Sequence, residues 1–206
     1  MGDKEAPKSV IKRLPVYLRN LDNLIRNDVE IISSRELSDD TGFTAEQIRK
    51  DLAYFGAFGT RGTGYNTYYL REKILEIIGL NEQTNIIVVG TGHLGIALAR
   101  YNIRKNPYVN VVAAFDIDPS LIGNKIIDAE IFHTSKMQEI VERFNVKVAV
   151  LAVPANDAQS AVEHIVKSGI KVVFNFATTK LIVPEDVHVH NADLSIELQS
   201  LIYYAT

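Results

Sequence analysis

Ile86-Ile87-Val88-Val89-Gly90-Thr91-Gly92-His93-Leu94-Gly95 is the stretch that decides the fold of this chain. A β-branched run breaks into Gly-x-Gly-x-x-Gly and continues into an apolar helical pattern at residues 96–99, which predicts a strand, a tight turn and a helix N-terminus. This is the context of a dinucleotide fingerprint. Gly90 makes the turn, Gly92 admits a pyrophosphate to the backbone and Gly95 lets the helix pack closely, while the first helical amides face the phosphates. The alternative is a glycine turn that closes an ordinary βα unit.

An acidic residue follows this stretch at the spacing that a dinucleotide site needs. Val109–Phe115 is typical of a buried strand, and Asp116 comes directly after it, about 20 residues beyond Gly95. A carboxylate there can accept hydrogen bonds from the adenosine ribose and would repel a 2′-phosphate, which favours NAD(H) over NADP(H). A solvated carboxylate at a strand end is the alternative. Asp118 precedes Pro119 and is expected to cap a helix.

Strands and helices alternate along the rest of the chain. Apolar runs at Val146–Val153 and Ile170–Phe174 predict two more buried strands, with a helix over Ala155–Ser168 between them. The pair Ser135-x-x-Gln138 predicts the start of an earlier helix. Continuous apolar strands that alternate with helices indicate a parallel sheet with both faces covered.

The carboxyl ends of these strands should hold the reactive half of the cofactor. Ligands of such sheets bind there, so the strand ends Ala152-Val153-Pro154 and Asn175-Phe176-Ala177 are expected to border the nicotinamide. A dehydrogenase would also need an acid or base and usually a substrate domain, yet only about 16 residues follow His190. We therefore expect no catalytic residues and no small-molecule substrate.

Two other patterns are interpreted as structural. Tyr101-x-x-x-Lys105 matches a short-chain dehydrogenase pair superficially, but it lies on the first helix after the fingerprint, so we do not interpret it as catalytic. The five histidines show no convincing metal-ligand spacing, with the alternation of His188 and His190 along one strand face as a weak exception. No metal site is predicted.

The residues before the fingerprint predict a small helical unit. Ile11, Leu14, Leu18, Leu21 and Ile25 fall on one face of a first helix, which ends near residue 27. A proline at position 15 must lie in its first turn or at a kink.

Two capping boxes follow this first helix. Ser33-x-x-Glu36 opens a short helix that stops by Gly42, and Thr44-x-x-Gln47 opens another, which together predict a helix-turn-helix.

The second of these helices carries side chains suited to DNA. Its inner face is Ile48, Leu52 and Phe55, and the residues expected to point away from it are Gln47, Arg49, Lys50 and Tyr54. Arginine and glutamine can read base edges, and lysine and tyrosine can contact phosphates. The glycine-rich segment at residues 59–65 predicts the wing of a winged helix, with Arg61 placed to enter a minor groove. Asp51 among these contacts weakens the case, and a protein-binding helical domain is the alternative.

Composition excludes several classes. With 206 residues and 47% hydrophobic content the chain can bury a core in one or two domains. Zero cysteines exclude disulfides and thiol chemistry, and the polar start and the short apolar runs predict a soluble, cytoplasmic protein with no membrane partner. A net charge of -3 argues against DNA binding through bulk positive charge, so any DNA contact must be local.

The last segment predicts an amphipathic helix. Leu194, Leu198, Leu201 and Ile202 share one face of it. It can pack on its own sheet or exchange with a second subunit, and the symmetry of a DNA-binding dimer favours exchange. We thus expect an α/β chain with a winged-helix domain over 1–80, a Rossmann domain over 81–190 and a swapped helix over 191–206.

Several of these motifs together resemble a known family. Gln47-Ile48-Arg49-Lys50-Asp51-Leu52-Ala53-Tyr54-Phe55-Gly56, Gly59-Thr60-Arg61-Gly62-x-Gly64-Tyr65, Gly90-x-Gly92-x-x-Gly95 and Phe115-Asp116-x-Asp118-Pro119 resemble the Rex redox-sensing transcriptional repressors over almost the whole chain. The resemblance implies a homodimer that binds operator DNA when NADH is scarce and releases it when NADH binds, with the terminal helix swapped between subunits.

The resemblance also implies roles for single residues. By position, Tyr101 is similar to a family tyrosine near the nicotinamide, and Arg19 and Asp193 to an arginine and aspartate that pair across subunits. Thr178-Thr179 departs from the proline expected in many relatives, which puts the shape of that loop in doubt. The residues expected to bind NAD, with NADH as effector and NAD+ competing, are Gly90, Thr91, Gly92, His93, Leu94, Gly95, Tyr101, Asp116, Val153, Pro154 and Phe176.

Taken with the motifs, the resemblance implies a repressor that senses the NADH/NAD+ ratio. One alternative is an NAD-dependent oxidoreductase whose N-terminal domain only mediates oligomerisation. Another is a protein-binding module that senses NAD without contacting DNA.

Overall fold

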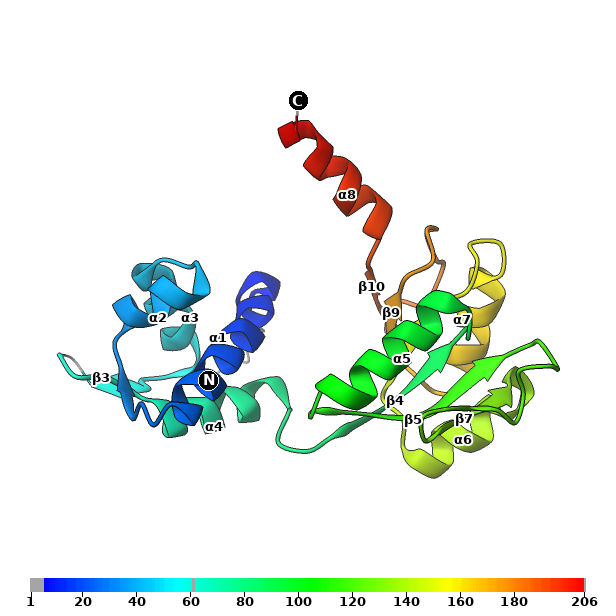
Figure 1. Cartoon of the computed structure of the whole chain (residues 1–206), viewed down its shortest axis with the longest axis horizontal. Coiled ribbons are helices and arrows are strands. Elements are labelled where there is room, and N and C mark those ends of the chain that lie inside the picture. The colour runs from blue at the N-terminus through cyan, green and yellow to red at the C-terminus, as the bar shows by residue number, and fades with distance from the viewer. Residues whose placement is uncertain (1–5, 61, 206) are drawn as a thin grey trace. The chain divides into compact units, whose positions relative to one another are not determined.

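The computed structural model describes residues 6–60 and 62–205, and the chain divides between Glu82 and Gln83 into two units (Figure 1). The described part of the N-terminal unit holds four helices and three short strands. In chain order these are α1 (Lys8–Arg26), β1 (Ile31–Ile32), α2 (Ser34–Thr41), α3 (Ala45–Phe55), β2 (Gly59–Thr60), β3 (Gly64–Asn66) and α4 (Thr67–Ile78).

This unit is a winged helix. Gly42, in the left-handed region with φ 74°, ends α2 and allows the sharp turn into α3. Strands β2 and β3 pair antiparallel as a hairpin, and β3 also pairs with β1, which gives the order β1-β3-β2. The predicted helix-turn-helix and wing are confirmed.

The two predicted capping boxes differ. At the start of α2 both hydrogen bonds of the box form between Ser33 and Glu36. At the start of α3 the Thr44 hydroxyl accepts from the Gln47 amide N–H, but the Gln47 side chain does not return to Thr44. Its side-chain amide donates to Asp51 instead, so this second box is only half formed.

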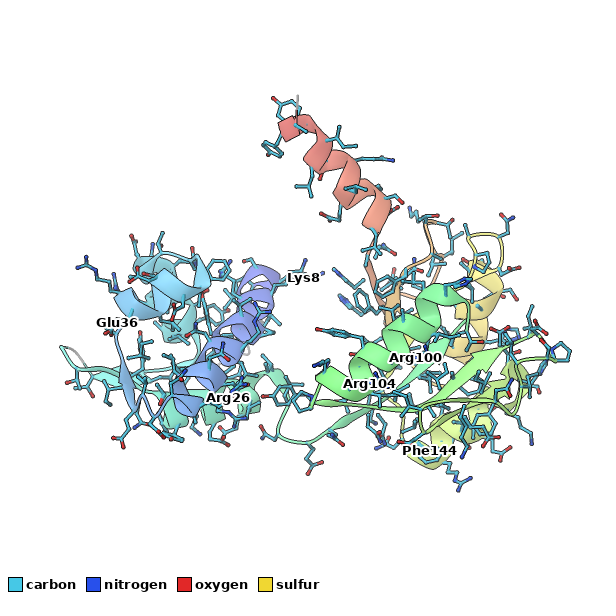
Figure 2. The ribbon with its side chains drawn as sticks, in the orientation of Figure 1. Lys8, Arg26, Glu36, Arg100, Arg104 and Phe144 are labelled. Carbon is cyan, nitrogen blue, oxygen red and sulfur yellow. The ribbon has the colours of Figure 1, made fainter. Side chains whose placement is uncertain are left out.

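Helix α1 runs through Pro15, which lies in its interior and not in its first turn (Figure 2, where Lys8 and Arg26 mark its ends). Its buried face is Val10, Leu14, Tyr17, Leu18 and Leu21. The face is rotated from the predicted one, because the aromatic Tyr17 takes the central place while Ile11 is 39% exposed.

The C-terminal unit is built on one seven-stranded sheet. Its strands are β4 (Thr84–Val89), β5 (Val109–Asp116), β6 (Lys125–Ile126), β7 (Ala129–His133), β8 (Val148–Leu151), β9 (Val172–Asn175) and β10 (His188–Asn191). The order is β10-β9-β8-β4-β5-β7-β6, and only the pairing of β6 with β7 is antiparallel. From β7 to β10 this is the strand order of a dinucleotide-binding Rossmann fold, with the order reversing beside β4.

Helices cover the two faces of this sheet unequally. The helices are α5 (His93–Lys105), α6 (Met137–Phe144) and α7 (Ala158–Lys167). Helices α6 and α7 pack with β4, β5, β8 and β9 in one apolar cluster, and α5 packs on the opposite face through Ala99. On β9, Val172 and Phe174 are 40% and 36% exposed, so part of the sheet in the described unit lacks a helical cover.

Three local predictions in this unit are wrong. Asp118 begins no helix, because its carboxylate accepts from Ser120 and closes a turn that leads to the unpredicted hairpin β6–β7. Ser135 does not cap the next helix: the ring of His133 accepts from the Ser135 N–H at the start of a 3-10 turn (Thr134–Lys136), and α6 begins after it. Strand β8 is also shorter than the apolar run that predicted it.

The chain ends in α8 (Leu194–Ile202) and a 3-10 turn, Tyr203–Ala205. Figure 1 shows α8 extending away from the sheet of its own unit. None of the residues of α8 is buried in the described structure, although five of them are large and apolar. Packing on its own sheet, one of the two predicted alternatives, is therefore not what the structure shows.

Candidate functional site

The fingerprint loop joins β4 to α5 with the geometry that its glycines require. Gly90 has φ 93°, and a Cβ there would meet the Ala152 carbonyl oxygen at 2.6 Å. A Cβ on Gly95 would lie 1.8 Å from the Gly90 oxygen, so only glycine lets the first turn of α5 approach the loop. These contacts agree with the tight turn and close helix packing expected for Gly90 and Gly95.

The surface above the loop is open. A Cβ on Gly92 would meet nothing within 4 Å, and His93 and Leu94 in the first turn of α5 are exposed. The first amides of a helix have no partner within it, and the helix dipole makes them an anion site. A phosphate group could therefore reach the backbone here without a steric obstacle.

Asp116 accepts four hydrogen bonds, two of them from this loop. Its Oδ2 accepts from the Thr91 N–H at 2.7 Å and from the Thr91 hydroxyl at 2.5 Å. Its Oδ1 accepts from the N–H groups of Ile117 and Asp118. Burial works to raise the pKa of Asp116, but the bonds from Thr91, Asp118 and Ile117 outweigh it and lower the pKa below the ordinary value. The carboxylate is thus ionised and fixed at the end of β5.

A cavity of about 220 Å³ lies between this carboxylate and the residues that follow β8. Of the predicted cofactor residues, Gly90, Gly92, Asp116, Val153 and Pro154 line it. Ala152, at the strand end that was expected to border the cofactor, also lines it. The sequence did not predict the rest of the wall, which consists of Val89, Phe115, Ile117, Thr134, Asp157, Ser160, Ala161 and His164. These residues come from the strand ends and α7, and no short motif marks them. His164 is held by a bond between its Nδ1 and the Ser160 carbonyl oxygen.

Other predicted cofactor residues lie outside the cavity wall. Thr91 is buried behind it, where it binds Asp116. Tyr101 is 65% exposed on α5, and Arg100 and Arg104, which flank it along the helix, are also exposed (Figure 2). Phe176 lies beyond the end of β9, where the centroid of its ring is 4.4 Å from that of Phe174. The Phe174 ring in turn lies 5.4 Å from the His190 ring, at a tilt of 40°.

Helix α3 presents three of the predicted DNA contacts to solvent. Arg49 is exposed and donates to the Ser34 hydroxyl at 2.7 Å, which ties it to the start of α2. Lys50 pairs with Glu46 one turn earlier, and Tyr54 is 41% exposed. An open groove of about 540 Å³ runs from Arg49 to the wing and Tyr65. Arg61, the predicted minor-groove residue, lies outside the described residues.

Two residues on α3 differ from the prediction. Asp51 is not on the DNA-facing side: it is 1% exposed and faces α1. Gln47 is half-buried, and its Nε2 donates to Asp51 at 2.8 Å. The predicted conflict between an exposed carboxylate and DNA is therefore absent at this position.

The predicted intersubunit pair is unpaired within the described residues. Arg19 on α1 is exposed, and none of the ion pairs between described residues includes it. Asp193 caps α8 through Oδ1, which accepts from the N–H groups of Ser195 and Ile196. Each side chain retains the capacity to bind an opposite charge.

The described residues contain no group of three His, Cys, Asp or Glu side chains that could hold a metal ion. No described helix combines the length and apolar character that crossing a bilayer requires.

Known families match both units. Residues 5–53 match the description "putative DNA-binding protein N-terminus", and residues 81–179 match "CoA binding domain". The redox-sensing transcriptional repressor Rex of Natranaerobius thermophilus is 61% identical over 201 residues, which cover 98% of this chain and 92% of the relative. This chain belongs to the Rex family.

Other Rex proteins extend this relationship. The Rex repressor of Carboxydothermus hydrogenoformans is 43% identical over 96% of this chain and 95% of its own. A crystal structure of RSP in complex with β-NAD+ and operator DNA matches with a TM-score of 0.91 at 39% identity, covering 98% of this chain and 94% of RSP. RSP in complex with β-NADH matches with a TM-score of 0.85 at 38% identity, covering 98% and 95%. The resemblance seen in the sequence is confirmed.

Proposed function

We propose that this protein binds operator DNA as a homodimer and releases it when NADH occupies the C-terminal unit, with NAD+ competing for the same site. One observation carries the proposal: the chain combines two features in its two units. The C-terminal unit has an open Gly-x-Gly-x-x-Gly loop beside a fixed carboxylate, and the N-terminal unit is a winged helix with exposed cations on α3. RSP, which shares both units, is described with β-NAD+ and operator DNA and with β-NADH. Such a repressor acts where chromosomal DNA and the nicotinamide nucleotides are, in the cytoplasm.

The C-terminal unit supports binding of NAD over coenzyme A despite the name of the matching family. The pyrophosphate would sit over Gly92 at the start of α5. Asp116 would exchange part of its bonding to Thr91 for the adenosine ribose hydroxyls, and a carboxylate would repel the ribose phosphate that NADP and coenzyme A carry. Val153, Pro154 and Phe176 follow strands on the nicotinamide side, and Tyr101 would approach it from α5.

The dimer rests on α8. Its apolar face is exposed, and a contiguous exposed apolar face of this kind marks a surface that a partner covers. A second copy of the chain, receiving α8 by exchange, supplies that cover, and Arg19 of one protomer would pair with Asp193 of the other in one of the two states. A dimer presents two α3 helices, as an operator with two half-sites requires.

A gel-shift titration with operator-like DNA tests the function. The full-length protein should shift the DNA in NAD+ and release it when NADH replaces NAD+. Asp116→Ala should weaken NADH binding, so that release needs more NADH, while binding to DNA in the absence of NADH is kept. If NADH does not change DNA binding, the proposed sensing role is wrong. If Asp116→Ala binds NADH as tightly as the wild type, Asp116 does not bind the ribose.

The same assay separates the alternatives. Turnover of hydride with a small substrate and no DNA shift would establish the oxidoreductase. NADH binding with neither turnover nor a DNA shift would establish a protein-binding sensor. The Rex relatives carry the names of repressors, which favours the proposal over both.

A further inference from the structure

A buried carboxylate, Asp51, lies on the inner side of α3. Asp51 is 1% exposed, and both of its oxygens are fully engaged. Oδ2 accepts from Arg13 Nε at 2.6 Å and the Tyr17 hydroxyl at 2.7 Å. Oδ1 accepts from Arg13 Nη2 and Gln47 Nε2, each at 2.8 Å. Four donors therefore fill the four acceptor positions of one carboxylate.

This cluster is rigid and stays ionised. Arg13 and Tyr17 lie one turn apart on α1, so they hold the carboxylate from one side. The ring of Phe43 packs edge-on against Tyr17 at 5.8 Å and lies under the Arg13 guanidinium. Burial works to raise the pKa of Asp51, but the bonds from Arg13, Tyr17 and Gln47 outweigh it and lower the pKa.

The charge of Asp51 decides which way the Gln47 amide points. An ionised carboxylate can only accept hydrogen bonds, so the amide must turn its nitrogen towards Asp51. The opposite orientation would place the Gln47 oxygen against the carboxylate. With the nitrogen fixed, Oε1 and the second N–H remain available and make no hydrogen bond to the described residues.

These two groups match one base. Gln47 lies in the first turn of α3, and the N-terminal residues of a recognition helix are those that reach base edges in the major groove. An N–H donor beside an oxygen acceptor is complementary to N7 and N6 of adenine. We infer that Asp51 is a positioning residue that orients Gln47 to read adenine in each operator half-site. This inference rests on the proposed function, because it assigns a base preference within the proposed DNA contact.

The test compares base preferences among full-length variants. Wild-type protein in NAD+ selects binding sites from a pool of random-sequence duplexes, and the enriched sites are sequenced. We expect an A·T pair to be favoured about 5- to 150-fold at one position in each half-site. Gln47→Ala and Asp51→Asn should both lose this preference while the other positions of the site keep theirs, since an asparagine accepts the Gln47 amide in either orientation.

Tyr17→Phe is the matched control. It removes one hydrogen bond from the same carboxylate but leaves the Oδ1 that faces Gln47, so it should keep the adenine preference. A merely structural role for Asp51 would instead weaken all positions together. An unchanged site profile in Asp51→Asn, or a uniform loss, overturns the inference and leaves the proposed function intact. Failure of the wild type to enrich any sequence overturns both.

A measurement on the wild type decides the matter if Asp51→Asn does not fold. In protein labelled with ¹⁵N-glutamine, one of the two Gln47 side-chain protons should exchange slowly with solvent because Asp51 accepts it. The other proton should exchange fast without DNA and slowly in the complex with a selected site. Two rapidly exchanging protons in the complex would refute the inference.

Discussion

The apolar face of α8 leads to the sharpest test of the proposed dimer. Leu198 is 64% exposed, and Leu194, Ile196 and Leu201 on the same helix are exposed to a similar degree. Full burial of such a side chain contributes about 1.5–3 kcal/mol, so covering the exposed part of one leucine contributes about 1–2 kcal/mol. A symmetric dimer contains the contact twice.

Replacing Leu198 with glutamate should therefore weaken the dimer strongly. The two lost contacts remove about 2–4 kcal/mol, which corresponds to an increase in the dissociation constant of about 30- to 1,000-fold. Glutamate is a good helix former, so the effect comes from the interface and not from the stability of α8. The desolvation of two carboxylates adds to the loss.

Gln199→Glu is the matched control, since it adds the same charge at the next position of the same helix, on an exposed polar side chain. Sedimentation equilibrium of the full-length proteins over a range of concentrations measures the dissociation constants. The control should stay within about fivefold of the wild type, as surface substitutions usually do. A Leu198→Glu dimer as tight as the wild type would refute the assignment of α8 to the interface.

Three further predictions concern the two units separately. Gly95→Ala should lower the free energy of unfolding by about 1–3 kcal/mol or more and reduce NADH affinity, because its Cβ would lie 1.8 Å from the Gly90 oxygen. Urea unfolding measures the stability and a fluorescence titration measures the NADH affinity, and unchanged values would contradict the packing role of Gly95. Arg61→Ala should weaken operator binding and reduce its salt dependence by about one unit of slope, because it removes the cation that the wing is expected to place in the minor groove. Binding isotherms at several salt concentrations would show no change if the wing assignment is wrong. The lowered pKa of Asp51 means that its carboxylate stabilises the fold above its unfolded pKa, and that this contribution is lost as the pH falls through the lower folded value. Urea unfolding below about pH 4 should therefore show a steeper loss of stability in the wild type than in Asp51→Asn, and parallel curves would exclude this role.

Short-range constraints explain what could be predicted. The close approach of α5 to the fingerprint loop was predictable because a Cβ on Gly95 would collide with the Gly90 oxygen, a backbone atom of the same βα unit. The stop of α2 at Gly42 and the box between Ser33 and Glu36 are equally local. In these places the residues that impose the geometry are neighbours in the chain.

Local ambiguity explains the wrong predictions. The sequence around Asp118 is compatible with a helix cap and with a turn, and the turn forms because the following residues pair as the β6–β7 hairpin. That hairpin was hidden because β6 has two residues and its turn puts Ile127, a β-branched residue, at φ 58°. His133 rather than Ser135 caps the next turn, a role that histidine plays too rarely to be read from a motif.

The site residues that the sequence did not predict depend on contacts between segments that are distant in the chain. Asp51 was assigned to the outer face because a carboxylate in an apolar core is unexpected, and its partner Arg13 lies 38 residues away in the chain. Likewise Thr134 and His164 reach the cavity only because the strand order brings β7 and α7 beside the fingerprint loop. Helical periodicity contains no information on either contact.

The size of the proposed switch indicates where its energy must come from. Helix α4 ends at Ile78 and β4 begins at Thr84, so a short connection joins the units and cannot by itself fix the spacing of two α3 helices. Moving a dimer from 1% to 99% in the released state requires NADH to bind that state about 10⁴-fold more tightly, roughly 5.5 kcal/mol. The proposed ion pair of Arg19 with Asp193 would form twice in a symmetric dimer, and two exposed pairs contribute at most about 2 kcal/mol. Most of the difference in free energy must therefore lie in how much of the α8 face is covered in each state and in the contacts of NADH itself. By linkage, operator DNA must weaken NADH binding by the same factor by which NADH weakens operator binding.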